Sequence, residues 1–130
     1  MKQQIKVAAA ALALQCCSAL VWANDTSVTA PTTTYSSISI IGSVNGNWDT
    51  DTQLTQSTFD PHVWMKKGVS LSGGEFKFRA NNSWDTNWGT NSEFFGTATV
   101  NGANIPLSAE WTYDVYFNDA TGDYTLIPVK

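Results

Sequence analysis

The sequence has one histidine and two cysteines among its 130 residues. His62 alone cannot supply a histidine-based zinc site or a catalytic triad, both of which need further partners. Cys16 and Cys17 are adjacent and lie near the start of the chain, in a segment with the features of an export signal. If that segment is removed, no disulfide, thiol nucleophile or thiolate metal ligand remains. We therefore predict neither a metal site nor a cofactor.

No apolar run is long enough to be a confident membrane span, which needs roughly 20 residues. The apolar run at 7–13 follows Lys2 and Lys6, as in a secretory signal peptide. The segment Val21–Ala23 then offers a small residue at both the −3 and the −1 position of a cleavage point. We predict that residues 1–23 are a signal peptide and that the exported protein is periplasmic, secreted or associated with the outer membrane.

Basic residues are also scarce. Removal of residues 1–23 takes away Lys2 and Lys6, which leaves five basic residues against eleven acidic ones and a net charge of about −6. An acidic surface argues against nucleic acid and against anionic membranes as partners. The remaining 107 residues are enough for one domain with one core.

The rest of the chain predicts an all-β fold. Residues 24–37 are rich in Thr and Ser and predict a flexible leader before a domain at 38–130. No later segment keeps an apolar period of 3.6 residues, which argues against amphipathic helices. Residue patterns predict strands at 38–41, 62–71, 75–80, 94–100, 111–118 and 123–129, with 105–107 as an edge segment. With a hairpin-like turn at Ser72–Gly74, these make a β-sandwich of six or seven short strands.

The stretch from Glu75 to Gly89, EFKFRANNSWDTNWG, combines a strand with an aromatic loop. Its first half alternates apolar with charged residues, which predicts one face in the core and two cations facing water. Trp84 and Trp88 then follow in a polar loop, where a tryptophan has no obvious place in the core. Aromatic side chains on a loop beside outward-facing cations indicate a recognition surface.

Three other tryptophans are divided by the same reasoning. Trp48 lies in the polar segment NGNWDTDT, which predicts a loop and an exposed ring. Trp64 and Trp111 lie in strand patterns instead, and we expect both to pack in the core or on a sheet face.

Four blocks of the sequence resemble one starch-binding module of the outer-membrane proteins SusE and SusF. They are IIGSVNGNWDTDT, EFKFRANNSWDTNWG, NGANIPL and WTYDVYFNDATGDYTLI, which together span about Ile38 to Ile127. The resemblance implies an immunoglobulin-like β-sandwich that binds starch and malto-oligosaccharides without catalysis. It also implies association with an outer-membrane glucan uptake system or an amylase. This chain differs from that family in having a single module.

The resemblance also implies a set of site residues. Trp48 of the GNWD block and Trp84 of the NSWD block would form an angled aromatic platform for the sugar. Lys77 would supply the cation and Asn104 of the NGANIP block the amide. Arg79 and Trp88 complete the predicted carbohydrate-binding residues.

Alternative interpretations remain open from the sequence. Alternating polar residues from Asn45 to Asp51 are typical of a calcium loop, although Thr50 stands where such a loop needs glycine. Asp49, Asp85 and Glu93 are the acidic residues available for a glycosidase pair, yet we expect no enzymatic activity. The same aromatic loops would also serve a protein-interaction or adhesin subunit. Lipid attachment at a cysteine is a poorer prediction than cleavage after Ala23.

Overall fold

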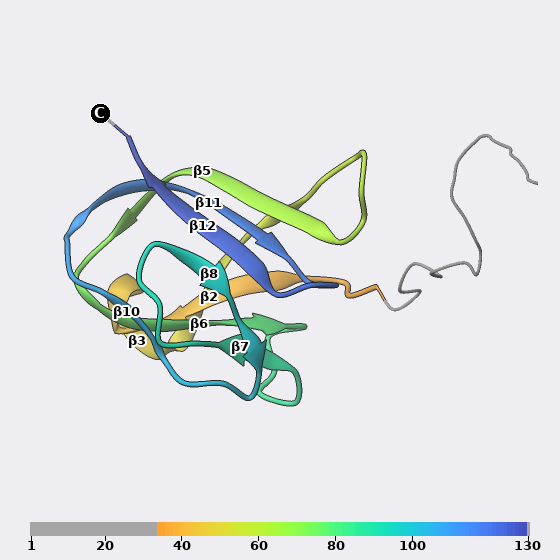
Figure 1. Cartoon of the computed structure of the whole chain (residues 1–130), viewed down its shortest axis with the longest axis horizontal. Helices are drawn as coiled ribbons and strands as arrows, with labels where there is room; N and C mark the ends of the chain where they lie inside the picture. The colour runs from red at the N-terminus through yellow and green to blue at the C-terminus, as the bar shows by residue number, and fades with distance from the viewer. Residues whose placement is uncertain (1–33, 130) are drawn as a thin grey trace, which may run out of the picture. The chain divides into compact units, whose positions relative to one another are not determined.

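The computed structural model describes residues 34–129, which fold into two antiparallel β-sheets that pack face to face (Figure 1). The first sheet has the order β3-β2-β6-β7-β9, and the short β10 pairs with the beginning of β6. Its strands are β2 (Ile38–Gly42), β3 (Asn47–Gln53), β6 (Gly74–Ala80), β7 (Asn87–Gly89), β9 (Thr99–Val100) and β10 (Ile105–Leu107). A single 3-10 turn, η1 (Ser43–Asn45), joins β2 to β3.

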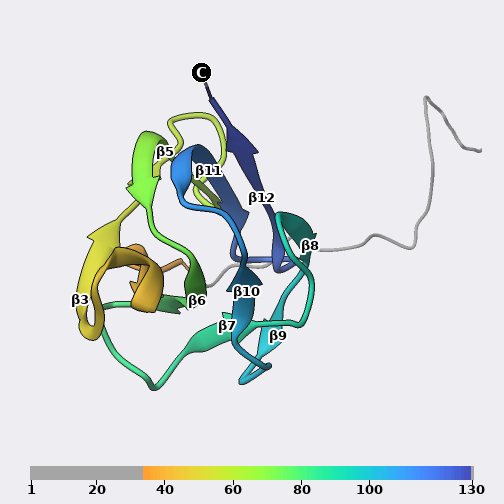
Figure 2. The ribbon, with the colours of Figure 1, turned by 90° about the vertical axis from the view of Figure 1, so that its left-hand side faces the viewer.

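The second sheet has the order β4-β5-β11-β12-β8. Its strands are β4 (Thr55–Gln56), β5 (Val63–Leu71), β8 (Phe95–Thr97), β11 (Trp111–Asn118) and β12 (Asp123–Pro128). In both Figure 1 and Figure 2, β5, β11 and β12 form one layer, and β6 and β7 lie in the other. The predicted all-β sandwich is therefore confirmed.

The core forms where alternating side chains of the two sheets meet. Phe76 and Phe78 of β6 are fully buried, as their alternation with charged residues predicts. The ring of Phe78 stacks on that of Phe117 in β11, with centroids 4.3 Å apart and planes at 14°. Trp64 is also confirmed as a core residue, being 3% exposed, and its indole Nε1 donates to the buried carboxylate of Asp119 at 2.7 Å.

Two connections differ from the prediction because the chain passes between the sheets. The turn at Ser72–Gly74 is not a hairpin, since it joins β5 in the second sheet to β6 in the first. The predicted strand at 94–100 is divided into β8 and β9, which belong to different sheets. With the short ladders β4, β7 and β9 included, the described part has eleven strands rather than six or seven. The segment at 105–107 is an edge strand, as Pro106 indicated.

Contacts to the sandwich begin before the predicted domain boundary at Ile38. The ring of Tyr35 meets Trp88 edge-on, with centroids 5.6 Å apart. The backbone and hydroxyl of Ser36 both donate to the Asn81 side-chain oxygen, at 3.1 and 2.8 Å. The predicted signal peptide at 1–23 lies outside the described residues. No helix in the described part is long and apolar enough to cross a membrane.

Candidate functional site: an aromatic pair on the outer face of the first sheet

The outer face of the first sheet brings together most of the predicted site residues. Because Phe76 and Phe78 point into the core, Lys77 and Arg79 of β6 point to the opposite face. The register of the sheet places Ile41 of β2 beside Lys77 on this face. Ile41 is fully buried although it lies outside the core between the sheets, so the side chains of the outer face must cover it.

A tight turn after β6 places Trp84. Asn81 and Asn82 adopt positive φ angles of 56° and 52°, and the Ser83 backbone donates to the Ala80 carbonyl at 3.1 Å. Two successive residues with positive φ are typical of a type I′ turn, a conformation that asparagine tolerates better than most residues. The two asparagines that the sequence predicted to end the strand thus turn the chain back over the outer face.

Trp48 and Trp84 form a tilted aromatic pair, with ring centroids 6.1 Å apart and planes at 38°. Trp84 is 45% exposed and Trp48 is partly exposed. The prediction that Trp48 lies in a loop is wrong, since it belongs to β3. The prediction that neither ring belongs to the core is confirmed. Two residues 36 positions apart in the sequence are therefore neighbours in the fold.

Arg79 supports the aromatic pair from below rather than facing water. Its guanidinium carbon lies 4.8 Å from the centroid of the Trp84 ring. Its Nε and one terminal nitrogen donate to the two carboxylate oxygens of Asp51, at 2.7 and 2.5 Å. Asp51 also accepts a hydrogen bond from the Ser39 hydroxyl. Arg79 is only 7% exposed, so the prediction of a solvent-facing cation is wrong for this residue.

The bond between Arg79 and Asp51 also shifts the ionisation of both groups. Hydrogen bonding to Arg79 is the largest influence on Asp51 and holds the pKa of its carboxyl below the ordinary value, against the opposing effect of burial. The pKa of Arg79 is raised by the same bond. Both groups are therefore charged at neutral pH, and the arginine is held in a fixed position under the Trp84 ring.

Lys77 is the cation of this face that keeps its donors available. Burial lowers the pKa of its ammonium group, and no hydrogen bond or ion pair ties it to another residue in the range 34–129. Its side chain lies over Gly89 of β7, where a Cβ would come within 2.9 Å of the lysine Cε. An added Cβ would also approach the Ala103 carbonyl oxygen to 1.9 Å, so only glycine fits at this position.

Asn104 lies near the other end of the β6 outer face. Its amide nitrogen donates to the Glu75 carboxylate at 3.1 Å, and its side chain is exposed. Glu75, Lys77 and Arg79 alternate along β6, so the row from Glu75 to Arg79 is about 13 Å long at roughly 3.3 Å per residue. Asn104 is therefore separated from the aromatic pair by Lys77 rather than placed against it.

Trp88 must be removed from the predicted site. It is 4% exposed, pairs with Phe78 across the sheet and packs against Phe117, with centroids 5.1 Å apart. Its neighbours Asn87 and Gly89 suggested a polar loop, yet β7 turns the Trp88 side chain inward. A ring buried in this way cannot contact a ligand on the outer face.

Trp111 is also placed differently from the prediction. It lies two residues before the buried Tyr113 on β11 and so belongs to the same face of the strand, but it is 55% exposed. The ladder with β12 ends at the pair Tyr113–Pro128, so no β12 residue pairs with Trp111 at the start of the strand. Trp111 is a surface residue and not part of the core.

Three supporting residues escaped the sequence analysis. Asp51 holds Arg79, and the Gln53 amide donates to the Asn82 side chain at 2.6 Å, which links β3 to the Trp84 turn. The buried Asn87 amide donates to the Trp84 carbonyl at 3.0 Å and to the Asn101 side chain at 3.1 Å. Its own Oδ1 has no hydrogen-bond partner. The only sequence signal was the alternation of Asp51 and Gln53 on one strand face.

Some residues of the alternative sites make other contacts. The Asn45 side-chain oxygen accepts a hydrogen bond from the Gly42 backbone at 3.2 Å, and the Asp51 carboxylate is bound to Arg79. No group of three metal-ligating side chains occurs among residues 34–129. Glu93 accepts the backbone and hydroxyl hydrogen bonds of Ser108, both at 2.5 Å, and Ser108 lowers the pKa of its carboxyl.

The fold and the site together define an all-β sandwich with a solvent-exposed, tilted aromatic pair on one sheet. No protein-family model matches the chain, and searches of curated proteins and of solved structures find no match either.

Proposed function

We propose that this protein binds α-1,4-glucan, without catalysis, on the outer face of the first sheet. The observation that carries the proposal is the tilted pair of Trp48 and Trp84, with planes at 38° and ring centroids 6.1 Å apart. Neighbouring apolar side chains that stay exposed on a soluble protein often mark a binding surface. Here an arginine, an aspartate and the asparagine-rich turn hold one of the rings in place.

The chemistry of a glucose unit fits this arrangement. Its apolar C–H face stacks on an indole, and its rim of hydroxyls needs fixed donors and acceptors. Two rings at an angle suit the curved α-1,4 chain better than a flat β-1,4 chain. Lys77 offers three ammonium donors beside the pair, and Asn104 with Glu75 offers an amide and a carboxylate further along the face.

The proposal gives Arg79 a role different from the one that the resemblance implied. Two nitrogens of its guanidinium group donate to Asp51, and the guanidinium group lies against the Trp84 ring. We assign it to positioning the ring rather than to donating to the sugar. Cation–π contacts of this kind contribute about 0.5–2 kcal/mol, depending on how far they are desolvated.

The wider context follows from the sequence. We propose an immunoglobulin-like module similar to those of SusE and SusF, exported by residues 1–23 and associated with an outer-membrane glucan uptake system or an amylase. One module acting by itself lacks the avidity of several in tandem, so the affinity of this domain for glucan should be modest.

Affinity electrophoresis tests the proposal directly. The protein is run in gels that contain amylopectin, pullulan, xylan or a soluble cellulose derivative. Retardation by amylopectin and pullulan alone, lost on Trp84→Ala and kept in Phe59→Ala, supports α-glucan binding. Phe59 is a suitable control because it is 98% exposed and belongs to no part of the site. Mobility unchanged by all four polysaccharides would favour the protein-interaction alternative.

A further inference from the structure

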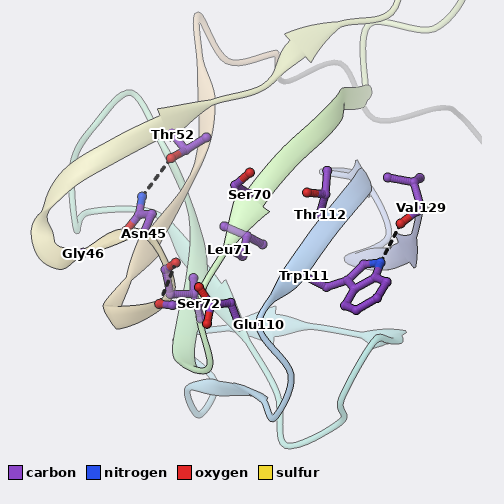
Figure 3. A pocket seen from close by; sticks show the side chains of 11 residues that line it. Asn45, Gly46, Thr52, Ser70, Leu71, Ser72, Glu110, Trp111, Thr112 and Val129 are labelled. Atoms are coloured by element: carbon purple, nitrogen blue, oxygen red, sulfur yellow. Dashed lines mark hydrogen bonds between the residues drawn. The ribbon is translucent and has the colours of Figure 1, made fainter.

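A groove whose lining includes neither Trp48 nor Trp84 lies at one end of the sandwich. It has a volume of about 770 Å³ and is open to solvent. Its lining comes from η1, the end of β5, the start of β11 and the segments beside them. In Figure 3, Asn45 and Thr52 lie at one end of the groove, and Trp111 and Val129 lie at the other.

The indole of Trp111 is exposed and yet fixed in position. It is 55% exposed, and its Nε1 donates to the Val129 carbonyl at 2.5 Å, as the dashed line in Figure 3 marks. The Val129 backbone in turn donates to the Thr112 carbonyl at 2.9 Å. These two bonds fasten the ring to the end of the second sheet, so the ring meets a ligand without losing much side-chain freedom.

Polar groups with free hydrogen-bonding capacity also line this groove, although Ser70 and Thr112 lie on the face of the sheet opposite to the one from which Trp111 projects. The hydroxyls of Ser70 and Thr112 come from residues that face each other across β5 and β11 and line the same groove. The carboxylate of Glu110 is exposed and has no hydrogen bond or ion pair to another residue in the described range. By contrast, the Asn45 amide nitrogen already donates to three acceptors, so it is not available to a ligand at that end of the groove.

The charge of the groove restricts the class of ligand. Glu110 is the only ionisable side chain among the described residues that line it, and none of them is a cation. Phosphates, nucleic acids and acidic peptides would therefore meet an unpaired negative charge. One indole is also too little apolar surface for a lipid chain. A neutral ligand with one C–H-rich face and many hydroxyls satisfies the ring, the carboxylate and the two hydroxyls together.

We propose that the groove at Trp111 is a second saccharide-binding site, which takes a neutral glycan chain. One sugar unit would stack on the Trp111 ring, and the hydroxyls of neighbouring units of the chain would donate to Glu110 and exchange hydrogen bonds with Ser70 and Thr112. The site itself rests on the groove, and only the preference for glucan rests on the proposed function. Two sites on one domain would let a single module hold a polysaccharide at two points and regain part of the avidity of tandem modules.

Fluorine NMR of the chain labelled with 5-fluorotryptophan separates the two sites. Each signal is assigned with a Trp→Phe variant, and maltoheptaose or cellohexaose is added into the millimolar range. We expect the Trp111 signal to shift saturably with at least one of these sugars, in wild type and in Trp84→Ala alike. Glu110→Gln should weaken the Trp111 response about tenfold, the size of one lost charge-assisted hydrogen bond. Phe59→Ala is the control for an unrelated exposed ring.

The outcomes distinguish this proposal from the first. If the Trp111 signal stays unmoved by both sugars, or moves only while Trp84 is intact, the second site does not exist. If the Trp48 and Trp84 signals stay still while Trp111 shifts, the aromatic pair has been assigned wrongly and the groove is the binding site. Trp111→Phe keeps a ring in place should Trp111→Ala perturb folding, and it is expected to leave the affinity at Trp84 unchanged.

Discussion

Replacing Trp84 with alanine is expected to abolish detectable α-glucan binding while the domain stays folded. The ring is 45% exposed, and its neighbours are Trp48 on one side and Arg79 on the other. It has no part in the core between the sheets. The substitution should therefore act on the ligand surface far more than on the fold.

The size of the effect follows from the exposed area. A large aromatic side chain buries up to about 250 Å² when fully covered, so a 45% exposed tryptophan offers about 110 Å² to a ligand. At about 25 cal/mol per Å², covering half or all of that area contributes roughly 1–3 kcal/mol. This corresponds to a loss of about tenfold to a hundredfold in affinity, enough to make a weak single module appear inactive.

The cost to stability should be smaller than that of a core substitution. Trp84→Ala removes one ring contact and one cation–π contact, each worth about 0.5–1.5 kcal/mol at a partly exposed site. Trp64, at 3% exposed, provides the comparison, because truncating a core tryptophan costs about 3–5 kcal/mol. Arg79 keeps its bond to Asp51 in the Trp84 variant.

The measurement is a calorimetric titration of maltoheptaose into wild type, Trp84→Ala, Trp48→Ala and Phe59→Ala, with a thermal melt of each of these proteins and of Trp64→Ala. Wild type and Phe59→Ala should bind alike, and both platform variants should fail to bind. If Trp84→Ala binds as tightly as wild type, the aromatic pair is not the glucan site. If it loses as much stability as Trp64→Ala, the ring is structural and the loss of binding carries no information about recognition.

Further predictions concern Asp51, Trp88, Tyr124 and the start of the exported chain. Asp51→Asn should weaken maltoheptaose binding severalfold and lower the free energy of unfolding by about 1–3 kcal/mol, measured by urea denaturation, because it removes the charged partner of Arg79. In wild type the pKa of Asp51 is lowered by folding, so this stabilisation should be complete above the ordinary pKa of 3.8 and be lost as the pH falls through the lowered value, which an acid titration of stability and binding would show. Trp88→Ala should cost about 3–5 kcal/mol of stability in the same assay, and a mild effect would contradict its core position. Burial raises the pKa of Tyr124 to about 12, so the stability it contributes should be present below pH 10 and decline as the pH rises toward 12, and alkaline melts of Tyr124→Phe should lack that decline. Intact-mass measurement of exported protein should give a chain that begins at Asn24 and carries no lipid.

Local patterns in the sequence were sufficient for most of the fold. Residue patterns predicted β5, β6, β11 and β12 within one or two residues. For β6 and β11 the pattern was an alternation of residue types, because a strand buried on one face repeats every second residue. Paired asparagines predicted the end of β6. Trp48 and Trp84 were recognised as surface rings because both are surrounded by polar residues and neither fits a strand's apolar face.

The tertiary structure decided which tryptophans are exposed where the local pattern was ambiguous. Trp88 is surrounded by polar and small residues like Trp84, but pairing of β7 with β6 turns it toward Phe117, which is far away in the sequence. Trp111 continues the alternation of Tyr113, yet it lies beyond the end of the β12 ladder and is left in water. Alternation predicts the face of the sheet toward which a side chain points, whereas its burial depends on whether another segment covers that face.

The ion-pair partner of Arg79 could not be predicted from the sequence either. A cation on an outward strand face is usually solvated, and its pattern in β6 gave no other indication. Only the pairing of β2 with both β3 and β6 brings Asp51 within 2.5 Å of Arg79, although the two are 28 residues apart. The sequence by itself therefore determined the longer strands and the placement of Trp48 and Trp84 outside the core. The sheet order determined which charged group holds which ring, because contacts across a sheet depend on strand pairing and not on local residue pattern.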